Sequence, residues 1–149
     1  MANLLDENVR QQVTAFFENL DKDVQVLYFG SDDPAECQHC AETRQLLEEV
    51  TGLSDKLHLS SYLLAESADL AKTFNVNAVP SFVIAALEGD QVVDFGIRYK
   101  GIPAGHEFTS LVNSLLIVSR RDSGLAEETR DYLKTLDKPV FLQVFVTPT

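Results

Sequence analysis

The sequence predicts an α/β fold in which a mixed central sheet is flanked by helices. Residues 24–29 form an apolar run that is too short for a helix and rich in β-branched and aromatic side chains, as expected of a strand buried on both faces. A helical pattern over 40–50 and a strand-like segment over 57–63 complete a β-α-β unit, whose strands run parallel. Residues 81–99, with a turn at 88–90, predict an antiparallel hairpin.

The segments outside these elements are predicted to be helices and connections. Four of them carry apolar residues at steps of three or four, the spacing of an amphipathic helix. They span residues 5–20, 67–74, 108–118 and 125–136.

Composition excludes several classes of function. The formal net charge of −11 on 149 residues argues against nonspecific binding to nucleic acid or to an anionic membrane, where a basic face is expected, so we expect protein partners. No apolar run approaches the roughly 18 residues of a membrane-spanning helix. The first residues lack the basic start and long apolar run of a signal peptide. Together with the presence of only two cysteines, this predicts a reducing cytoplasm.

Both cysteines lie in one motif, Cys37-Gln38-His39-Cys40, between the strand over 24–29 and the helix over 40–50. A Cys-x-x-Cys that follows a strand and opens a helix is typical of a dithiol that cycles with a disulfide. Two alternatives are an ordinary pair of small buried side chains and half of a zinc site. The strand before the motif and the helix after it favour the redox reading.

The motif assigns a separate role to each thiol. We expect Cys37 to attack a substrate disulfide as a thiolate, because unpaired N–H groups and the positive end of the dipole lie at a helix N-terminus. We expect Cys40, one turn further along and deeper, to resolve the mixed disulfide. The redox-active disulfide then carries the electrons, and no bound organic cofactor is required.

His39 lies between the two cysteines and is a candidate for tuning the pKa of Cys37. Its imidazole can donate a hydrogen bond or positive charge to the thiolate. The alternative is an exposed histidine that the start of the helix tolerates. Asp32, Asp33 and Glu36 act in the opposite direction, although exposed carboxylates are heavily screened.

The end of the chain resembles an earlier part of it. Leu136-Asp137-Lys138 aligns with Leu20-Asp21-Lys22, and the helix and strand patterns on either side agree. We therefore expect a redox domain over 1–120. Residues 121–149 would supply a linker and the first helix and strand, over 140–146, of a second unit that stops before a second motif.

Three stretches resemble the thioredoxin superfamily, and within it the glutaredoxin-like protein disulfide oxidoreductases that carry two fused thioredoxin-like units. They are Glu36-Cys37-Gln38-His39-Cys40, Val76-Asn77-Ala78-Val79-Pro80-Ser81-Phe82 and Gly96 to Phe108. The resemblance implies a thioredoxin-like fold. It also implies a cis Val79-Pro80 bond facing the cysteines, where the backbone of Val79 pairs with an extended substrate. The strand over 24–29 departs from thioredoxin because it has no buried carboxylate.

The same resemblance leaves three functions open. The first is a thiol-disulfide oxidoreductase that acts on protein disulfides and is supplied by a thioredoxin-reductase-like or flavoprotein reductase. The second is an electron relay, because Gly101 to Phe108 also resembles the thioredoxin-fold region of flavoprotein hydroperoxide reductases, whose partner is a peroxiredoxin. The third is a non-catalytic interaction module with zinc at the thiols. The direction of net electron flow stays open.

Overall fold

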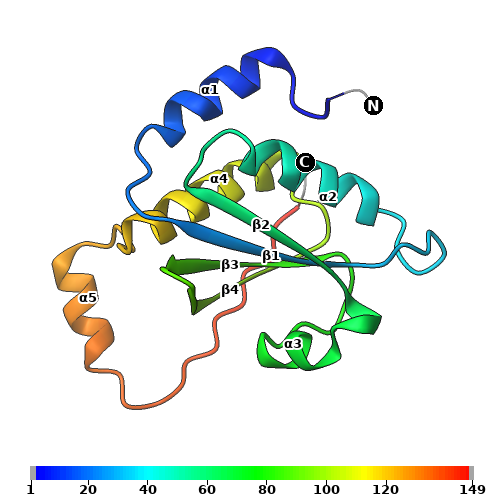
Figure 1. Ribbon diagram of the computed structural model, residues 1–149. Helices are drawn as coiled ribbons and strands as arrows, with labels where there is room; N and C mark the ends of the chain where they lie inside the picture. The colour runs from blue at the N-terminus through cyan, green and yellow to red at the C-terminus, as the bar shows by residue number, and fades with distance from the viewer. Residues whose placement is uncertain (1–2, 148–149) are drawn as a thin grey trace.

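The computed structural model describes residues 3–147 and confirms a mixed sheet flanked by helices (Figure 1). In chain order the elements are α1 (Glu7–Phe17), β1 (Val24–Gly30), α2 (Cys40–Thr51), β2 (Leu57–Leu63), a 3-10 turn (Leu64–Glu66), α3 (Ala68–Thr73), β3 (Ser81–Glu88), β4 (Gln91–Lys100), α4 (His106–Arg120) and α5 (Glu127–Lys134). The ends of each strand and of the four longer helices lie within three residues of where the sequence places them, since apolar periodicity is a local property.

The four strands pair in the order β2-β1-β3-β4. β1 runs parallel to β2 over its whole length, with Val24 opposite Leu57, and antiparallel to β3, with Val26 opposite Ile84. β3 and β4 form the predicted antiparallel hairpin, which turns at Gly89 with φ +62°. β1 is therefore a central strand, and all seven of its residues are buried.

Alternating side chains of β1 enter two different layers of the core. Val24, Val26 and Tyr28 pack with apolar residues of α1, α2 and α4, whereas Leu27 and Phe29 pack with those around α3. Figure 1 shows the same division, with α1, α2 and α4 over one face of the sheet and α3 on the other. The cysteine motif follows β1 directly, so the best-buried strand of the sheet supports it.

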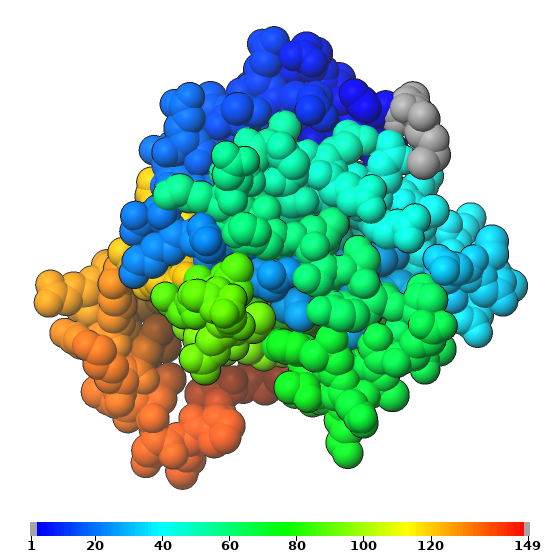
Figure 2. Space-filling model, in the orientation of Figure 1, coloured from blue at the N-terminus to red at the C-terminus, as the bar shows by residue number. Residues whose placement is uncertain are grey.

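The C-terminal segment adds nothing to this core. Within the described chain, every residue from 122 to 147 is exposed, and α5 projects from the body of the molecule (Figure 2). The predicted strand over 140–146 is wrong, because these residues form no ladder and Phe141, Leu142 and Phe145 are more than 80% exposed. A strand needs a neighbouring strand for its backbone N–H and C=O groups, and residues 3–147 place none beside this segment. Pro148 and Thr149, which align with Asp32 and Asp33, lie outside the described residues.

Among the helices formed by residues 3–147, none has the length and apolar character needed to traverse a lipid bilayer.

Candidate redox site

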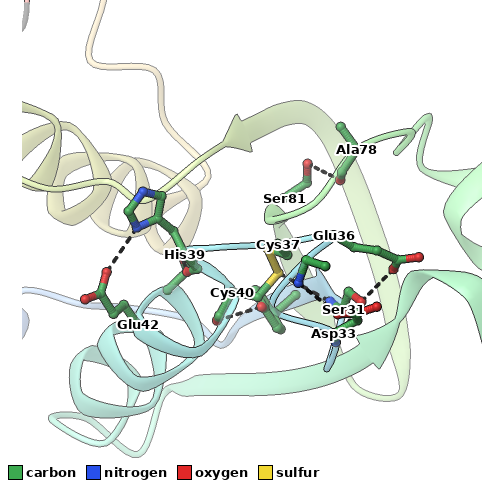
Figure 3. Close-up of a disulfide and its surroundings, with 12 residues drawn as sticks. Ser31, Asp33, Glu36, Cys37, His39, Cys40, Glu42, Ala78 and Ser81 are labelled. Carbon is green, nitrogen blue, oxygen red and sulfur yellow. Dashed lines mark hydrogen bonds and ion pairs between the residues drawn. A yellow bond between two sulfur atoms is a disulfide. The ribbon is translucent and has the colours of Figure 1, made fainter.

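Cys37 and Cys40 form a disulfide in the loop between β1 and α2, with their Cα atoms 5.4 Å apart (Figure 3). Both residues are buried, Cys37 with 7% of its surface exposed and Cys40 with 3%. The pair therefore lies just beneath the surface at the C-terminal end of a central strand, where ligands and chemistry collect in open α/β sheets.

The loop that carries Cys37 is held by its own hydrogen bonds. The Asp33 carbonyl accepts the N–H of Glu36 at 3.1 Å and that of Cys37 at 3.0 Å, and the Asp33 carboxylate accepts the N–H of Ala35 at 2.8 Å. Helix α2 begins at Cys40, with His39 as its N-cap. Cys40 is therefore the first residue of α2, and Cys37, expected at the helix N-terminus, lies three residues earlier in the loop that precedes the helix. The Asp33 contacts take the backbone of Cys37 out of the helix.

Tyr28, on β1, contacts the backbone of Cys40. Its hydroxyl donates to the Cys40 carbonyl at 2.8 Å, and the side chain is buried. Burial raises the pKa of Tyr28 to about 12. The positive charge of Arg44 lowers this pKa, and the negative charge of Asp32 raises it further. The phenol is therefore protonated at neutral pH and acts as a hydrogen-bond donor rather than as a base.

Gly30 makes room for this tyrosine. A Cβ atom at Gly30 would lie 2.3 Å from the Tyr28 hydroxyl, so no larger residue fits without moving the ring. Sequence reasoning did not identify Tyr28 or Gly30 as part of the site. The available signal was their spacing of two along β1, which places both on the face that α2 covers.

Ser31 connects the loop to Cys40, and it too was not identified from the sequence. Its backbone N–H donates to Cys40 Sγ at 3.3 Å, and its hydroxyl donates to the Glu36 carboxylate at 2.8 Å (Figure 3). Loop residues that bond through their backbone leave no pattern of residue types in a sequence, so only the folded loop identifies this donor.

Among the hydrogen bonds of the described residues, none joins His39 to a sulfur. Its side chain is half exposed and its Nδ1 lies 3.2 Å from the Glu42 carboxylate, one turn along α2. Figure 3 shows the imidazole turned toward Glu42 and away from the disulfide. In this position the imidazole contacts the Glu42 carboxylate on its own helix.

The Val79-Pro80 peptide bond is cis and lies in the loop that precedes β3. Contacts on both sides hold this loop: the Pro80 carbonyl accepts the Gly101 N–H at 2.8 Å, and Ser81 Oγ donates to the Ala78 carbonyl at 2.7 Å. Val79 lines a hollow of about 240 Å³ together with Ser31 and Glu36. The structure thus brings the backbone predicted to receive substrate next to the loop that carries Cys37.

A second cavity, of about 260 Å³, reaches the disulfide. Its lining includes both cysteines, Tyr28 and the Arg44 side chain. Solvent can therefore approach Cys40 as well as Cys37. Between residues 3 and 147, no three side chains of the His, Cys, Asp and Glu types gather in a way that could hold a metal ion.

Comparison with known proteins relates this geometry to two groups. No family model matches the sequence. Curated relatives include the F subunits (AhpF) of alkyl hydroperoxide reductase from Staphylococcus aureus, 30% identical over 98% of this chain, and from Escherichia coli, 34% identical over 90%. The chain spans only 25% and 22% of the length of these two relatives.

Solved structures give the same two groups. A protein disulfide oxidoreductase from Aeropyrum pernix superposes with a TM-score of 0.73 and 29% identity, over 90% of this chain and 57% of that one. The NTD_N/C domain of the Enterococcus faecalis alkyl hydroperoxide reductase AhpF superposes with a TM-score of 0.77 and 27% identity. The match covers 90% of this chain and 62% of that one. The chain therefore has a thioredoxin-like fold and is homologous to the N-terminal region of AhpF and to part of a protein disulfide oxidoreductase.

Proposed function

We propose that this chain is a thiol-disulfide oxidoreductase that exchanges electrons with protein disulfides through Cys37 and Cys40. The observation that carries the proposal is the Cys37–Cys40 disulfide itself, held at the end of β1 beside the cis-proline loop. The homology to a protein disulfide oxidoreductase supports it. A vicinal dithiol of this kind stores two electrons without a bound organic cofactor.

The proposed reaction assigns the first attack to Cys37. Its thiolate attacks one sulfur of the substrate disulfide, a mixed disulfide forms, and the other substrate sulfur leaves as a thiolate. Cys40, as a thiolate, then attacks Cys37 Sγ; the Cys37–Cys40 bond forms and the second substrate sulfur leaves with the electron pair. Two electrons have moved from the dithiol to the substrate. The greater exposure of Cys37 supports this order.

Substrate is proposed to bind as an extended strand along the backbone of Val79. Main-chain pairing of this kind suits partners of varied sequence, because it does not depend on their side chains. The hollow shared by Val79 and Leu64 lies beside that backbone and can take a substrate side chain. His39 is proposed to stabilise the Cys37 thiolate through its charge when protonated.

Reduction of insulin by dithiothreitol tests the proposal. We expect Cys37→Ser to abolish catalysis, and Cys40→Ser to accumulate a mixed disulfide with substrate, because the resolving thiol is missing. Glu128→Gln, on the exposed helix α5, is the control and should keep the parent rate. A Cys37→Ser variant with full activity would contradict the assignment of the nucleophile.

A second candidate function is electron relay from a flavoprotein reductase to a peroxiredoxin. It is favoured by the AhpF relatives, whose name is that of an alkyl hydroperoxide reductase and of which this chain spans about a quarter. Rates of disulfide reduction in a peroxiredoxin and in insulin, measured side by side with a flavoprotein disulfide reductase, separate the two functions. A marked preference for the peroxiredoxin would favour the relay. Tightly bound zinc in the reduced protein, without a reversible disulfide, would instead favour a non-catalytic module.

We also propose that residues 121–149 belong to a second thioredoxin-like unit and that the protein works in a reducing cytoplasm. Exposed apolar side chains of residues 140–146 support the first point, because such a run normally packs in a core. The protein disulfide oxidoreductase from Aeropyrum pernix, of which this chain covers 57%, is consistent with it. The presence of only two cysteines supports the second point.

A further inference from the structure

We propose that Ser31 is a positioning residue that holds a backbone hydrogen-bond donor against Cys40 and so stabilises the Cys40 thiolate. This inference rests on the proposed function, since it concerns how the same disulfide opens. The donor is the Ser31 N–H, which lies 3.3 Å from Cys40 Sγ. This N–H bonds to Cys40, which is the less exposed of the two cysteines. Strand β1 supplies no carboxylate to this cysteine.

The Ser31 side chain fixes the direction of its own N–H group. Its hydroxyl donates to Glu36 at 2.8 Å and accepts the Asp33 N–H at 3.2 Å, which closes the loop between the end of β1 and the cysteine motif. Ser31 is thus tied on both sides while its N–H points at the sulfur. An alanine at this position would keep the N–H and lose the hydrogen bonds to Glu36 and Asp33.

The donor matters most when the disulfide opens. In that step a substrate thiolate attacks Cys37 Sγ and forms a mixed disulfide, the Cys37–Cys40 bond breaks, and the electron pair passes to Cys40 Sγ. No proton moves in this step. A thiolate is a far stronger hydrogen-bond acceptor than a disulfide sulfur, so the Ser31 N–H stabilises the open state more than the closed one. The donor therefore makes Cys40 a better leaving group and favours the reduced motif.

Other titratable groups around Cys40 also affect its charge, and Ser31→Ala removes a direct contact of only one of them, the Glu36 carboxylate. They come from the loop, from β1 and β2 and from α2, and are Asp32, Glu36, Tyr28, Tyr62 and Arg44. Tyr28 donates to the Cys40 carbonyl rather than to the sulfur. The Ser31 N–H is thus the donor to Cys40 Sγ found among the described residues.

The test uses a Cys37→Ser background, in which Cys40 is the only thiol of the chain. The rate of alkylation by iodoacetamide is measured against pH in this protein and after adding Ser31→Ala, Ser31→Thr or Ser114→Ala. We expect Ser31→Ala to lower the thiolate fraction of Cys40 at a fixed pH roughly threefold to tenfold. This is less than for complete loss of a hydrogen bond to a charged group, because alanine keeps the N–H and loses only the contacts that orient it. Ser31→Thr, which keeps a hydroxyl, should restore it.

Ser114→Ala is the matched control, because Ser114 also bonds a partner, the Tyr99 hydroxyl at 3.0 Å, but lies on α4 away from the cysteines. It should leave the thiolate fraction unchanged. If Ser31→Ala lowers the free energy of unfolding but leaves the thiolate fraction unchanged, or if Ser31→Thr behaves like Ser31→Ala, the role is structural and the inference is wrong.

The parent protein, with both cysteines, gives a second readout. The equilibrium between its disulfide and glutathione should shift toward the disulfide by a similar factor in Ser31→Ala. Both readouts are independent of turnover, so failure of the protein to reduce insulin would overturn the proposed function and leave this inference standing. If Ser31→Ala leaves the alkylation profile unchanged in a protein that reduces insulin, this inference is wrong and the proposed function stands.

Discussion

Two regions of this molecule share a sequence pattern but differ in structure. Residues 16–31, here called the first copy, and residues 132–147, the second copy, each join the end of a helix to an apolar run through Leu-Asp-Lys. In the first copy the apolar run is β1 and is fully buried. In the second copy it has no regular structure, and Phe145, which aligns with the fully buried Phe29, is 85% exposed.

The difference shows that a pattern of apolar residues does not by itself make a strand. β1 is buried because β2 and β3 pair with its two edges and helices cover its two faces. The second copy has the same kind of side chains, but within the described residues no strand pairs with its apolar run and its side chains are exposed. The contribution of an apolar residue to stability is therefore set by its neighbours rather than by its type.

The largest expected effect comes from truncating the aligned phenylalanines. Phe29→Ala should lower the free energy of unfolding by about 3–5 kcal/mol, because it removes a fully buried ring and leaves a cavity in the layer beneath α3. Phe145→Ala should change it by less than about 0.5 kcal/mol. Denaturant unfolding of both variants measures the contrast. A large loss from Phe145→Ala would mean that the second copy packs on the core.

A smaller effect is expected from Tyr28 at alkaline pH. Its pKa is raised from 10.0 to about 12 in the folded chain, so the unfolded state loses the phenolic proton first. Stability should be unaffected below about pH 10 and should then fall by about 2–3 kcal/mol as the pH rises toward 12.

Unfolding titrations at several alkaline pH values check this prediction. Tyr28→Phe should lose this part of the pH dependence, and Tyr132→Phe, an exposed tyrosine of the second copy, controls for the loss of a hydroxyl. If Tyr28→Phe falls as steeply as the parent protein, the alkaline loss comes from another group.

Gly30 and Val146 occupy aligned positions and provide a third contrast. Gly30→Ala should cost about 1–3 kcal/mol, because its Cβ would overlap the Tyr28 ring, and the displaced hydroxyl should release the Cys40 carbonyl. Val146→Ala should be neutral, since its side chain is 81% exposed. Unfolding and the glutathione equilibrium are the two measurements. A Gly30→Ala variant with parent values in both would show that the ring moves without cost.

The smallest effect is expected from removing the second copy. A chain that ends at Gly124 should unfold within about 0.5 kcal/mol of the parent, because every residue from 125 to 147 is exposed. It should also bind less of a hydrophobic dye, because the exposed apolar run is gone. A clear loss of stability would show that this segment packs on the sheet in solution.

The sequence alone located most of the helices and strands of this protein and its cysteine pair. Helices, strands, the hairpin turn and the Cys37-x-x-Cys40 motif followed from local spacing, which each segment carries whatever surrounds it. The resemblance to a known family, rather than spacing, singled out Val79 and Pro80.

Only the tertiary structure decided which groups meet the cysteines. The Tyr28 hydroxyl and the Ser31 N–H reach Cys40 because β1 ends beneath α2, whereas His39 bonds to Glu42 instead of to a sulfur. It also decided that β1 is a strand and that its aligned counterpart is not. The physical reason is the same in both cases: hydrogen bonds and burial depend on partners distant in the sequence, and no local pattern specifies them.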